Sequence, residues 1–371
     1  MATKIQPYTE DRVPAVKEFN RRLRAGRVHF QFPEEHASSR LPKRSDRTVY
    51  QEYFLAVEED RVCGGYILKH QSCSFSGRIL PVAIYRLAIS EGAIDRRYGL
   101  VALQLLRDAL QKQPLLFGLG MGGLDQPIAR LLGQAGWSLH PVAFYFQVVR
   151  PFRFLRGLTY LRASRPLRWL LDLLAVTGLG WVGIHAVQGA LRLGARRSEP
   201  ADLDIVPRFD GWAEELWAAC KDHYRMIAVR DSATLNTLYP EGNDRFIRLK
   251  VIRKGEVVGW VVALDTTMSE QKQFGNLRVG SIADALARPE DAAEVVRAAS
   301  AFLRSRGVDI IVSNQSHRAW CRALRDSGFL SGPSNFVLGL SPALAELLAP
   351  VRESIPQLHI NRGDGDGPLH L

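Results

Sequence analysis

The chain has 371 residues, more than one typical domain, which suggests two or three folded units. Hydrophobic residues make up 46% and charged residues 23%, proportions that argue against an intrinsically disordered chain. The 49 Lys and Arg against 38 Asp and Glu give a net charge of +11, which favours an anionic partner such as a phosphorylated cofactor, an acidic lipid surface or a nucleic acid.

Cysteine usage and the first residues indicate the compartment. The four cysteines, Cys63, Cys73, Cys220 and Cys321, lie far apart and include no CxxC pair. This spacing argues against a zinc site or a disulfide framework, so no metal site is expected. Residues 1–6 lack the apolar stretch of a secretory signal, and we therefore expect a reducing, cytoplasmic environment.

The first half of the chain predicts a strand meander followed by alternating helices and strands. A helix at 99–111 would place Leu100, Leu103, Leu106 and Leu110 on one face. The other predicted elements are strands at 53–58, 62–72, 79–90, 115–119 and 142–149 and a helix at 125–135.

The second half repeats this order of elements. Leu132 and Gly136 recur as Leu324 and Gly328, in both cases 192 residues later (328 − 136 = 192). A glycine suits the left-handed residue that ends a helix, and an aromatic residue follows it in both copies. We therefore expect an internal duplication. The elements predicted in the second copy are strands at 245–253, 257–265, 277–283 and 309–313 and helices at 290–305 and 316–327.

Residues 151–198 differ in character from both halves. Apolar and basic residues interleave at 152–162, and residues 169–193 are nearly all apolar. About 20 apolar residues can cross a bilayer, but Gly178, Gly180 and Gly183 interrupt this run. Two interpretations stay open: an in-plane amphipathic hairpin with arginines at the lipid headgroups, or a helical pair buried against the two units.

A candidate phosphate-binding motif, Arg-Arg-Tyr-Gly-Leu, occupies residues 96–100 between a predicted strand and a predicted helix. A glycine at the start of a helix lets backbone N–H groups approach a phosphate, and the helix N-terminus adds partial positive charge. Two arginines can bind a pyrophosphate through bidentate hydrogen bonds. The motif predicts a diphosphate-binding loop, with a solvated helix cap as the alternative.

In this context the motif resembles the acyl-CoA loop of GNAT acetyltransferases, whose pattern is Arg or Gln, two residues, Gly, one residue, then Gly or Ala. Val101 departs from the small final residue. The Leu-x-x-x-Gly-Trp and Leu-x-x-x-Gly-Phe segments resemble the family's helix-to-strand junction. The resemblance covers about residues 5–150 and, more loosely, 201–340. It implies an α/β (α+β) fold with two tandem GNAT-like mixed-sheet units joined by an amphipathic helical insertion.

The implied organisation has four segments. These are a GNAT-like acyl-CoA-binding unit at 1–150, the helical segment at 151–198, a second, degenerate GNAT-like unit at 199–345 and a C-terminal tail at 346–371. The second unit is degenerate because its corresponding loop has no glycine, and Glu290 and Asp291 would repel a phosphate. The pair Asp364 and Asp366 could hold a cation, but a flexible polar tail is favoured.

The resemblance also implies site residues for acyl transfer from acetyl-CoA or another acyl-CoA. Glu91, at the mouth of the splayed strand, is the candidate catalytic base, with a solvated carboxylate as the alternative. Leu132 stands where the family often has a tyrosine acid, so Tyr145 is the candidate substitute, with a core tyrosine as the alternative. The strand backbone would pair with the pantetheine arm and the loop would wrap the pyrophosphate, which gives the cofactor-binding set Leu87, Ala88, Ile89, Arg96, Arg97, Tyr98, Gly99 and Leu100.

Three functions remain open. The leading one is CoA-dependent N- or O-acyl transfer to a cell-envelope, polysaccharide or lipid-linked acceptor, with the protein peripheral at the inner face of a membrane. The second is aminoacyl transfer from aminoacyl-tRNA, because Fem-type enzymes resemble two such folds sharing one cleft. A tRNA donor does not need the glycine-bearing loop, so a nucleic-acid partner is not expected. The third is a non-catalytic GNAT-fold binding protein.

Overall fold

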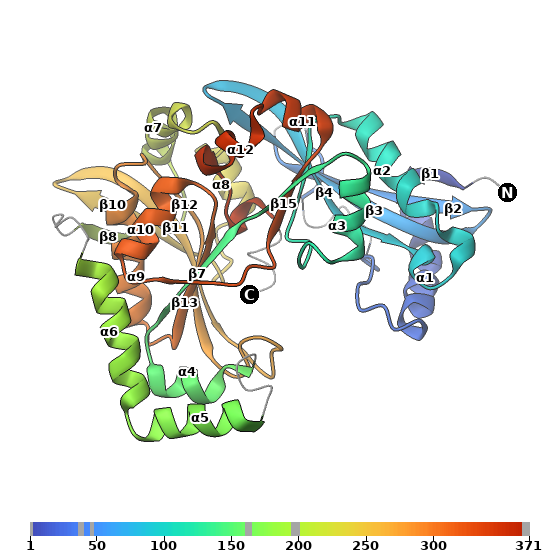
Figure 1. The fold of residues 1–371 in the computed structure, drawn as a ribbon. Coiled ribbons are helices and arrows are strands. Elements are labelled where there is room, and N and C mark those ends of the chain that lie inside the picture. Colours follow the sequence, from blue (N-terminus) through green and yellow to red (C-terminus); the bar gives the residue numbers. More distant parts are fainter. Residues whose placement is uncertain (1–2, 36–40, 45–47, 160–164, 194–200, 366–371) are drawn as a thin grey trace. The chain divides into compact units, whose positions relative to one another are not determined.

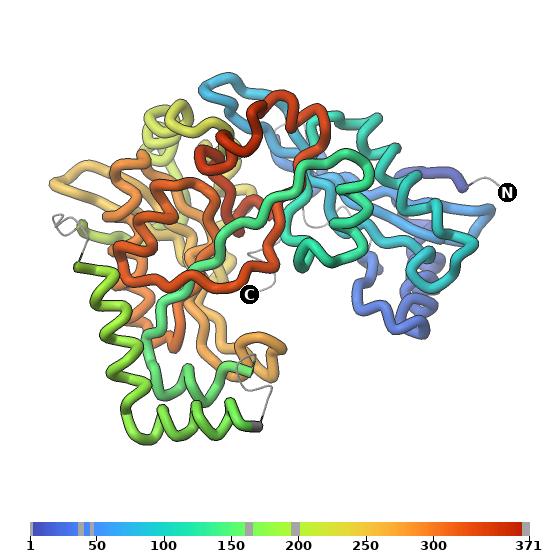
Figure 2. Tube along the Cα trace, viewed as in Figure 1, coloured from blue at the N-terminus to red at the C-terminus, as the bar shows by residue number. Residues whose placement is uncertain are grey.

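The computed structural model describes residues 3–35, 41–44, 48–159, 165–193 and 201–365. The chain divides into two compact units, each built from two stretches of sequence (Figures 1 and 2). Unit 1 contains Met1–Pro141 and Val337–Ser354, and unit 2 contains Val142–Phe336 and Ile355–Leu371.

Unit 1 is a mixed sheet with helices on both faces. Its main strand order is β1-β2-β3-β4-β5-β15-β6. The first four strands are antiparallel, and β4 and β5 are parallel. The strands are β1 (Lys4–Pro7), β2 (Tyr50–Glu58), β3 (Arg61–Phe75), β4 (Arg78–Ser90), β5 (Leu116–Leu119), β6 (Ser138–Pro141) and β15 (Val337–Leu340). The helices are α1 (Val13–Ala25), α2 (Val101–Lys112), α3 (Pro127–Gln134), α11 (Pro342–Leu347) and α12 (Val351–Ser354).

Each face of the unit 1 sheet has its own core. Phe19 and Leu23 of α1 are fully buried in a cluster with strand residues of one face. Leu105 of α2 and Leu132 of α3 belong to a second cluster on the other face. The predicted apolar face of α2 is wrong for Leu100, which is 71% exposed, because the helix begins only at Val101 and its buried face includes Leu105.

Unit 2 repeats this plan around a sheet of order β14-β7-β13-β12-β11-β10-β8. Its strands are β7 (Ala143–Val148), β8 (Asp202–Ile205), β10 (Ile247–Arg253), β11 (Glu256–Thr267), β12 (Arg278–Ala287), β13 (Ile310–Gln315) and β14 (Leu330–Gly332), with the short strands β9 (Met226–Ala228) and β16 (Leu358–His359). Its helices are α4 (Pro151–Gly157), α5 (Arg165–Val176), α6 (Leu179–Leu193), α7 (Gly211–Cys220), α8 (Ser232–Leu238), α9 (Ala292–Ser305) and α10 (Arg318–Asp326).

The two halves of the chain exchange a strand. β7 follows β6 directly in sequence, yet β7 pairs with β13 and β14 in the sheet of unit 2. β15, from the end of the second half, lies between β5 and β6 in the sheet of unit 1. The units therefore differ from the predicted segments 1–150 and 199–345. The predicted helical segment is present as α4 to α6, and Leu155 of α4 and Leu171 of α5 lie in the core cluster of unit 2.

The two copies end their corresponding helices with the same geometry. Gly136 and Gly328 have φ of +82° and +87°, the left-handed conformation predicted from the sequence. Trp137 N donates to Leu132 O and Phe329 N donates to Leu324 O, both at 3.0 Å. Two mixed sheets in tandem are thus present, as predicted.

Among the described residues, no single helix has both the length and the apolar composition to cross a membrane. Only α5 and α6 taken together have them, as a pair bent by 83° at the break between them.

Candidate functional site

The parallel strands β4 and β5 pair briefly and then separate. Their register has two pairs, Ala83 with Leu116 and Ile84 with Phe117. β4 continues to Ser90, and within the described residues it has no further pair with β5. This leaves the β5-facing edge of residues 87–89 without a strand partner, at the position predicted for the pantetheine arm.

A β-bulge bends β4 where the strands separate. Between the pairs Gly65 with Ile89 and Ile67 with Arg86, β4 has one residue more than β3. Leu87, in this bulge, has φ of +46°, which is unusual for a residue with a side chain. Bulges redirect a strand and are common next to functional sites. Leu87, Ala88 and Ile89 therefore lie in the irregular part of β4.

Residues 91–100 join β4 to α2 through two short 3-10 turns, η3 (Glu91–Ala93) and η4 (Arg96–Tyr98). The Ser90 hydroxyl accepts from Gly92 N at 3.0 Å, and the Asp95 carboxylate accepts from Arg97 N at 3.0 Å. The Arg97 side chain folds back on Asp95 at 2.6 Å and, with its amide, holds the pKa of that carboxyl below its usual value. The loop is thus ordered by its own side chains.

Three of the amides predicted to wrap a pyrophosphate already have acceptors inside the loop. Arg97 N donates to the Asp95 side chain, Tyr98 N to Asp95 O and Gly99 N to Arg96 O. The amides of residues 101–103 open α2, and no described group accepts from them. No side chain caps α2, and its first turn holds no acidic residue. The unengaged donors therefore lie one turn later than the sequence predicts.

Cationic and apolar groups surround this helix start. Arg96 is exposed and forms no ion pair with a described residue, and the Arg97 side chain is 78% exposed. Leu100 and Leu103 are 71% and 42% exposed. An anion at these amides would meet the positive end of the helix, the exposed guanidinium of Arg96 and that of Arg97, which pairs with Asp95.

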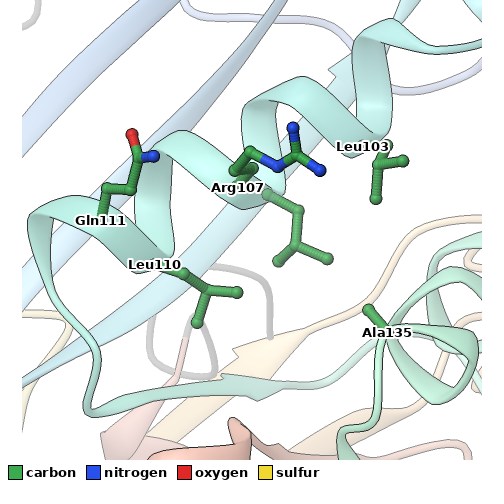
Figure 3. Close-up of a pocket in the computed structure, with 6 residues that line it drawn as sticks. Leu103, Arg107, Leu110, Gln111 and Ala135 are labelled. Atoms are coloured by element: carbon green, nitrogen blue, oxygen red, sulfur yellow. The ribbon is translucent and has the colours of Figure 1, made fainter.

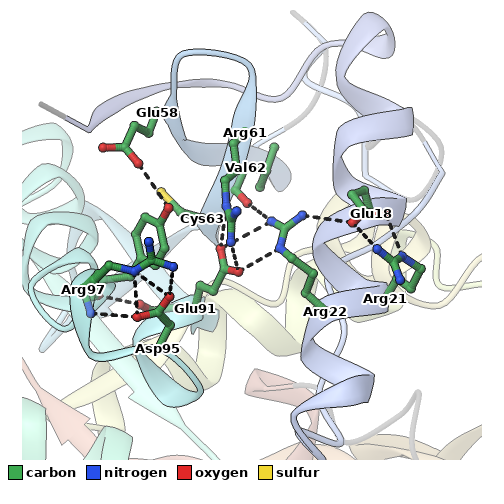
Figure 4. A network of polar contacts seen from close by, with 12 residues as sticks. Glu18, Arg21, Arg22, Glu58, Arg61, Val62, Cys63, Glu91, Asp95 and Arg97 are labelled. Atoms are coloured by element: carbon green, nitrogen blue, oxygen red, sulfur yellow. Dashed lines mark hydrogen bonds and ion pairs between the residues drawn. The ribbon is translucent and has the colours of Figure 1, made fainter. Parts of the chain in front are cut away.

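Glu91 lies directly after β4 and is held by two arginines (Figure 4). Arg22 donates to it at 2.7 and 3.3 Å and Arg61 at 2.5 and 3.3 Å, so both carboxylate oxygens accept from guanidinium groups. The side chain of Glu91 is buried at 1% exposure. This geometry joins α1, β3 and the start of the loop, and it leaves no oxygen of Glu91 facing solvent.

Tyr145 lies on β7 in unit 2, whereas the loop and Glu91 belong to unit 1. Its side chain is 5% exposed and lies in the main core cluster of unit 2. Burial raises the pKa of Tyr145, which makes the phenol a weaker acid than a solvated tyrosine. The structure therefore places the two candidate catalytic residues in different units.

A shallow apolar groove lies beside α2 on the face turned toward the end of α3 (Figure 3). Leu103, Arg107 and Leu110 line it from α2, and Ala135 lines it from the residue that caps α3. Leu103, which lines the groove, also lies in the uncapped first turn of α2. It offers apolar surface next to the candidate anion-binding amides.

Unit 2 has the same strand divergence. β12 and β13 pair from Val279 with Ile310 to Ser281 with Val312, and β12 then carries an extra residue opposite β11 between Ile282 and Asp284. Here the C-terminal segment contacts both strands. Its turn η8 (Arg362–Asp364) follows Asn361, which bridges to Gln315 of β13.

A buried ionic network fixes this segment. Arg230 donates to Asp284 at 3.0 Å and to Asp364 at 2.8 Å, and all three side chains are 1% exposed. Tyr239 and Asn361 donate to Asp284, both at 2.8 Å. The prediction of a flexible tail is wrong for residues 358–364, because Asp364 is a buried ion-pair partner. Asp366 lies outside the described residues.

The connection from β12 to α9 is shorter than the loop of unit 1 and carries acidic residues at the start of the helix. It has four residues, 288–291, in place of the ten at 91–100. Asp291 precedes α9 and Glu294 lies in its first turn, and they meet Arg253 at 2.7 and 3.9 Å. These carboxylates occupy the positive end of the helix.

Comparison by sequence finds no family model that matches this chain and no curated protein that matches it. Comparison of the structure finds a protein of unknown function from Enterococcus faecalis V583, described as a probable N-acyltransferase. It matches with a TM-score of 0.51 and 10% identity over 94% of this chain and 75% of that one. Saccharomyces cerevisiae N-myristoyltransferase with bound myristoyl-CoA matches with a TM-score of 0.53 and 10% identity over 92% and 78%. A GCN5-related N-acetyltransferase from Anabaena variabilis ATCC 29413 matches with a TM-score of 0.53 and 11% identity over 91% and 72%.

The chain has the GNAT fold. Because each match covers more than nine-tenths of the chain, the likeness includes both units. The prediction of two tandem GNAT-like units is therefore confirmed, whereas the Fem-type resemblance stays a prediction. At 10–11% identity the likeness concerns the fold, and the roles of individual residues rest on the geometry described above.

Sequence reasoning missed several residues that shape the GNAT-like loop of unit 1. Asp95 could have been found, because an Asp two residues before an amide at a helix start is a common capping signal. Arg22 and Arg61 could not, since they lie 69 and 30 residues from Glu91 and carry no motif. The role of Asp364 in unit 2 is hidden for the same reason.

Proposed function

We propose that this chain is an acyltransferase that binds acetyl-CoA or another acyl-CoA at unit 1 and transfers the acyl group to an amine or hydroxyl. The proposal draws on the shared fold, since one matching structure holds myristoyl-CoA. The observation that carries it is the start of α2, which follows the exposed Gly99 and Leu100 and has neither a side-chain cap nor an acidic residue, next to the unpaired edge of β4.

The absence of a side chain at Gly99 supports this proposal. Its φ of −57° is ordinary for any residue, so the backbone conformation does not require a glycine. A Cβ at Gly99 would meet only Arg96 O, at 3.2 Å. The missing side chain therefore serves access from outside, as a phosphate approaching the helix start would need.

The unpaired edge of β4 suits the pantetheine arm, which contains two amide groups. Backbone groups of Leu87, Ala88 and Ile89 would pair with these amides as a strand would. The arm would hold the thioester carbonyl near the point where β4 and β5 separate, so that the acceptor attacks in a fixed orientation. The acceptor's nitrogen or oxygen bonds to the carbonyl carbon as the carbon–sulfur bond breaks, and the acceptor's proton passes to the departing thiolate, which leaves as the thiol of CoA.

The acceptor in this proposal is a cell-envelope, polysaccharide or lipid-linked molecule, reached from the cytoplasmic side of a membrane. Two features favour it over a small soluble acceptor. The chain carries a net charge of +11, which suits an acidic surface. Exposed apolar side chains are concentrated on α5 and α6.

Isothermal titration with acetyl-CoA and with longer acyl-CoAs tests the donor site. We expect binding to the wild-type chain and no measurable binding to Gly99→Glu, because a carboxylate at the helix start would repel the diphosphate. Gly211→Glu is the matched control, since Gly211 is an exposed glycine at the start of α7 with open space around it. Absence of binding to every acyl-CoA by the wild-type chain would contradict the proposal.

A further inference from the structure

Exposed apolar side chains gather on α5 and α6. Of the 17 large hydrophobic residues exposed in the described part of the chain, ten belong to these two helices. Trp169 is 78% exposed and Trp181 55%. Such a patch marks an interaction surface when it is contiguous and rimmed by polar groups. The ten residues are Leu167, Trp169, Leu170, Leu173, Val176, Leu179, Trp181, Val182, Val187 and Leu193.

Other side chains of the same helices anchor them in unit 2. Leu171 and Ala175 of α5 lie in the main core cluster. The amide of Gln188 on α6 lies at 3.0 and 3.2 Å from the backbone N and O of Val148, and Arg192 donates to Ser327 O at 3.3 Å. A crossing of a bilayer by this bent pair would break these polar contacts. The pair therefore leaves these apolar side chains exposed while it stays attached to the unit.

The charges around this face select its partner. Among the described side chains of α4, α5 and α6 there are four arginines, Arg153, Arg156, Arg168 and Arg192, and one acidic residue, Asp172. The side chains of Arg153 and Arg156 on α4 are 63% and 58% exposed, and each lies at long range from a carboxylate, Asp309 at 3.8 Å and Asp172 at 3.9 Å. A second copy of the same face would bring like charges together, which disfavours self-association. A surface of anionic lipids has the opposite charge and accepts apolar side chains below its headgroups.

We propose that the exposed face of α5 and α6 docks onto an anionic lipid bilayer, with both helices lying in the interface. Trp169 and Trp181 would lie at the level of the headgroups, where tryptophan is favoured, and the leucines would reach the acyl chains. Arg153 and Arg156 would meet lipid phosphates. This inference does not depend on acyl transfer, although docking would bring a lipid-linked acceptor to the protein.

Flotation with lipid vesicles tests the docking with the full chain. We expect binding to vesicles of phosphatidylcholine mixed with phosphatidylglycerol, weaker binding to phosphatidylcholine alone, and release by high salt. The double variant Trp169→Glu, Leu173→Glu should bind at least about 100-fold more weakly, because two large apolar contacts are lost. Ile205→Glu is the matched control, since Ile205 is 64% exposed on β8 and belongs to neither helix, and it should bind as the wild type does.

Four outcomes would overturn the proposal. The first is failure of the wild-type chain to bind either vesicle, and the second is equal binding by the double variant. The third is a dimer, seen by analytical ultracentrifugation, that the double variant abolishes, since this face would then join two copies. Chain that resists extraction with alkaline carbonate would show insertion across the bilayer and would contradict docking in its plane. Circular dichroism establishes that each variant is folded.

Discussion

Units 1 and 2 share the same strand divergence but treat it differently. In unit 1, β4 bulges at Leu87 and leaves its pairing with β5, and the loop that follows leads to an uncapped helix. In unit 2, β12 bulges before Asp284 and leaves its pairing with β13, but the C-terminal segment fills the adjoining space. The divergence is therefore a property of the fold. Whether it can hold a ligand depends on what the rest of the chain places beside it.

The same contrast holds for charge. The first turn of α2 lacks acidic residues, whereas Asp291 and Glu294 stand at the start of α9 and pair with Arg253. In unit 2, carboxylates of the chain itself thus occupy the start of the helix. In unit 1 the corresponding helix start is left for an external anion. This division suggests a binding copy and a stabilising copy, and four experiments separate the two roles.

The largest effect is expected from Arg230→Ala in unit 2. This change leaves Asp284 and Asp364 buried without their cation, which costs about 3–5 kcal/mol. Chemical denaturation followed by tryptophan fluorescence measures the loss. Arg253→Ala is the control, because its ion pair is partly exposed and should contribute less than about 1 kcal/mol. Equal effects of the two changes would show that the filled divergence does not stabilise unit 2.

Acid should destabilise unit 2 through His317, which caps α10 by accepting from Ala319 N. Burial, with a smaller contribution from Arg318, lowers the pKa of His317 to about 4. The unfolded chain takes up this proton near pH 6.5 and the folded chain only near pH 4, so stability falls as the pH drops between these values. The loss is on the order of 2–3 kcal/mol.

His317→Asn keeps the helix cap and removes the titrating ring. The variant should therefore lose less stability between pH 6.5 and pH 4 than the wild type does, measured by denaturation across this range. An unchanged pH dependence would show that His317 is not the group responsible.

Alanine substitutions at Gly363 and Gly99 compare the two places where parallel strands separate. In unit 2 the C-terminal segment fills this place, and in unit 1 it stays open. A Cβ at Gly363 would lie 2.5 Å from the Tyr239 hydroxyl and 2.6 Å from Asp284, so Gly363→Ala should cost about 1–3 kcal/mol. At Gly99 the only near atom is Arg96 O at 3.2 Å, and Gly99→Ala should change the free energy of unfolding by less than about 1 kcal/mol. A large loss in both variants would mean that Gly99 serves packing, which contradicts its role in access.

The smallest effect is expected from Glu91→Gln on acyl transfer. If Glu91 acts by positioning the loop, kcat should fall by no more than about tenfold, whereas loss of a general base costs about 100- to 10,000-fold. Steady-state kinetics at several pH values distinguish these roles, because removal of a base also removes a limb of the pH profile. A loss of the larger size with unchanged stability would restore Glu91 as the base.

The order of helices and strands could be predicted because it depends on local patterning. The glycines at 136 and 328 and the apolar strands around them give both copies the same signature. The spacing of Val16, Phe19 and Leu23 also indicates α1, which the prediction does not include. Local patterns specify an element, but they do not specify its neighbours.

The strand exchange shows this limit, because β7 and β15 are apolar strands that could complete either sheet. The site shows it as well. The exposed Gly99 follows from sequence, whereas the Arg22–Glu91 and Arg230–Asp364 contacts join residues 69 and 134 positions apart. Such contacts come from tertiary packing, so no local pattern in a single sequence indicates them.

Because of the exchanged strands, neither half of the chain can complete its sheet alone. A fragment ending at residue 150 would carry β7 without β13 and β14, and its β5 and β6 would lack the strand that joins them. A fragment of the remainder would carry β15 with no sheet to enter. Either piece made alone would display bare strand edges and aggregate, whereas the two produced in one cell could complement each other. Both halves of the chain are therefore needed to complete either sheet.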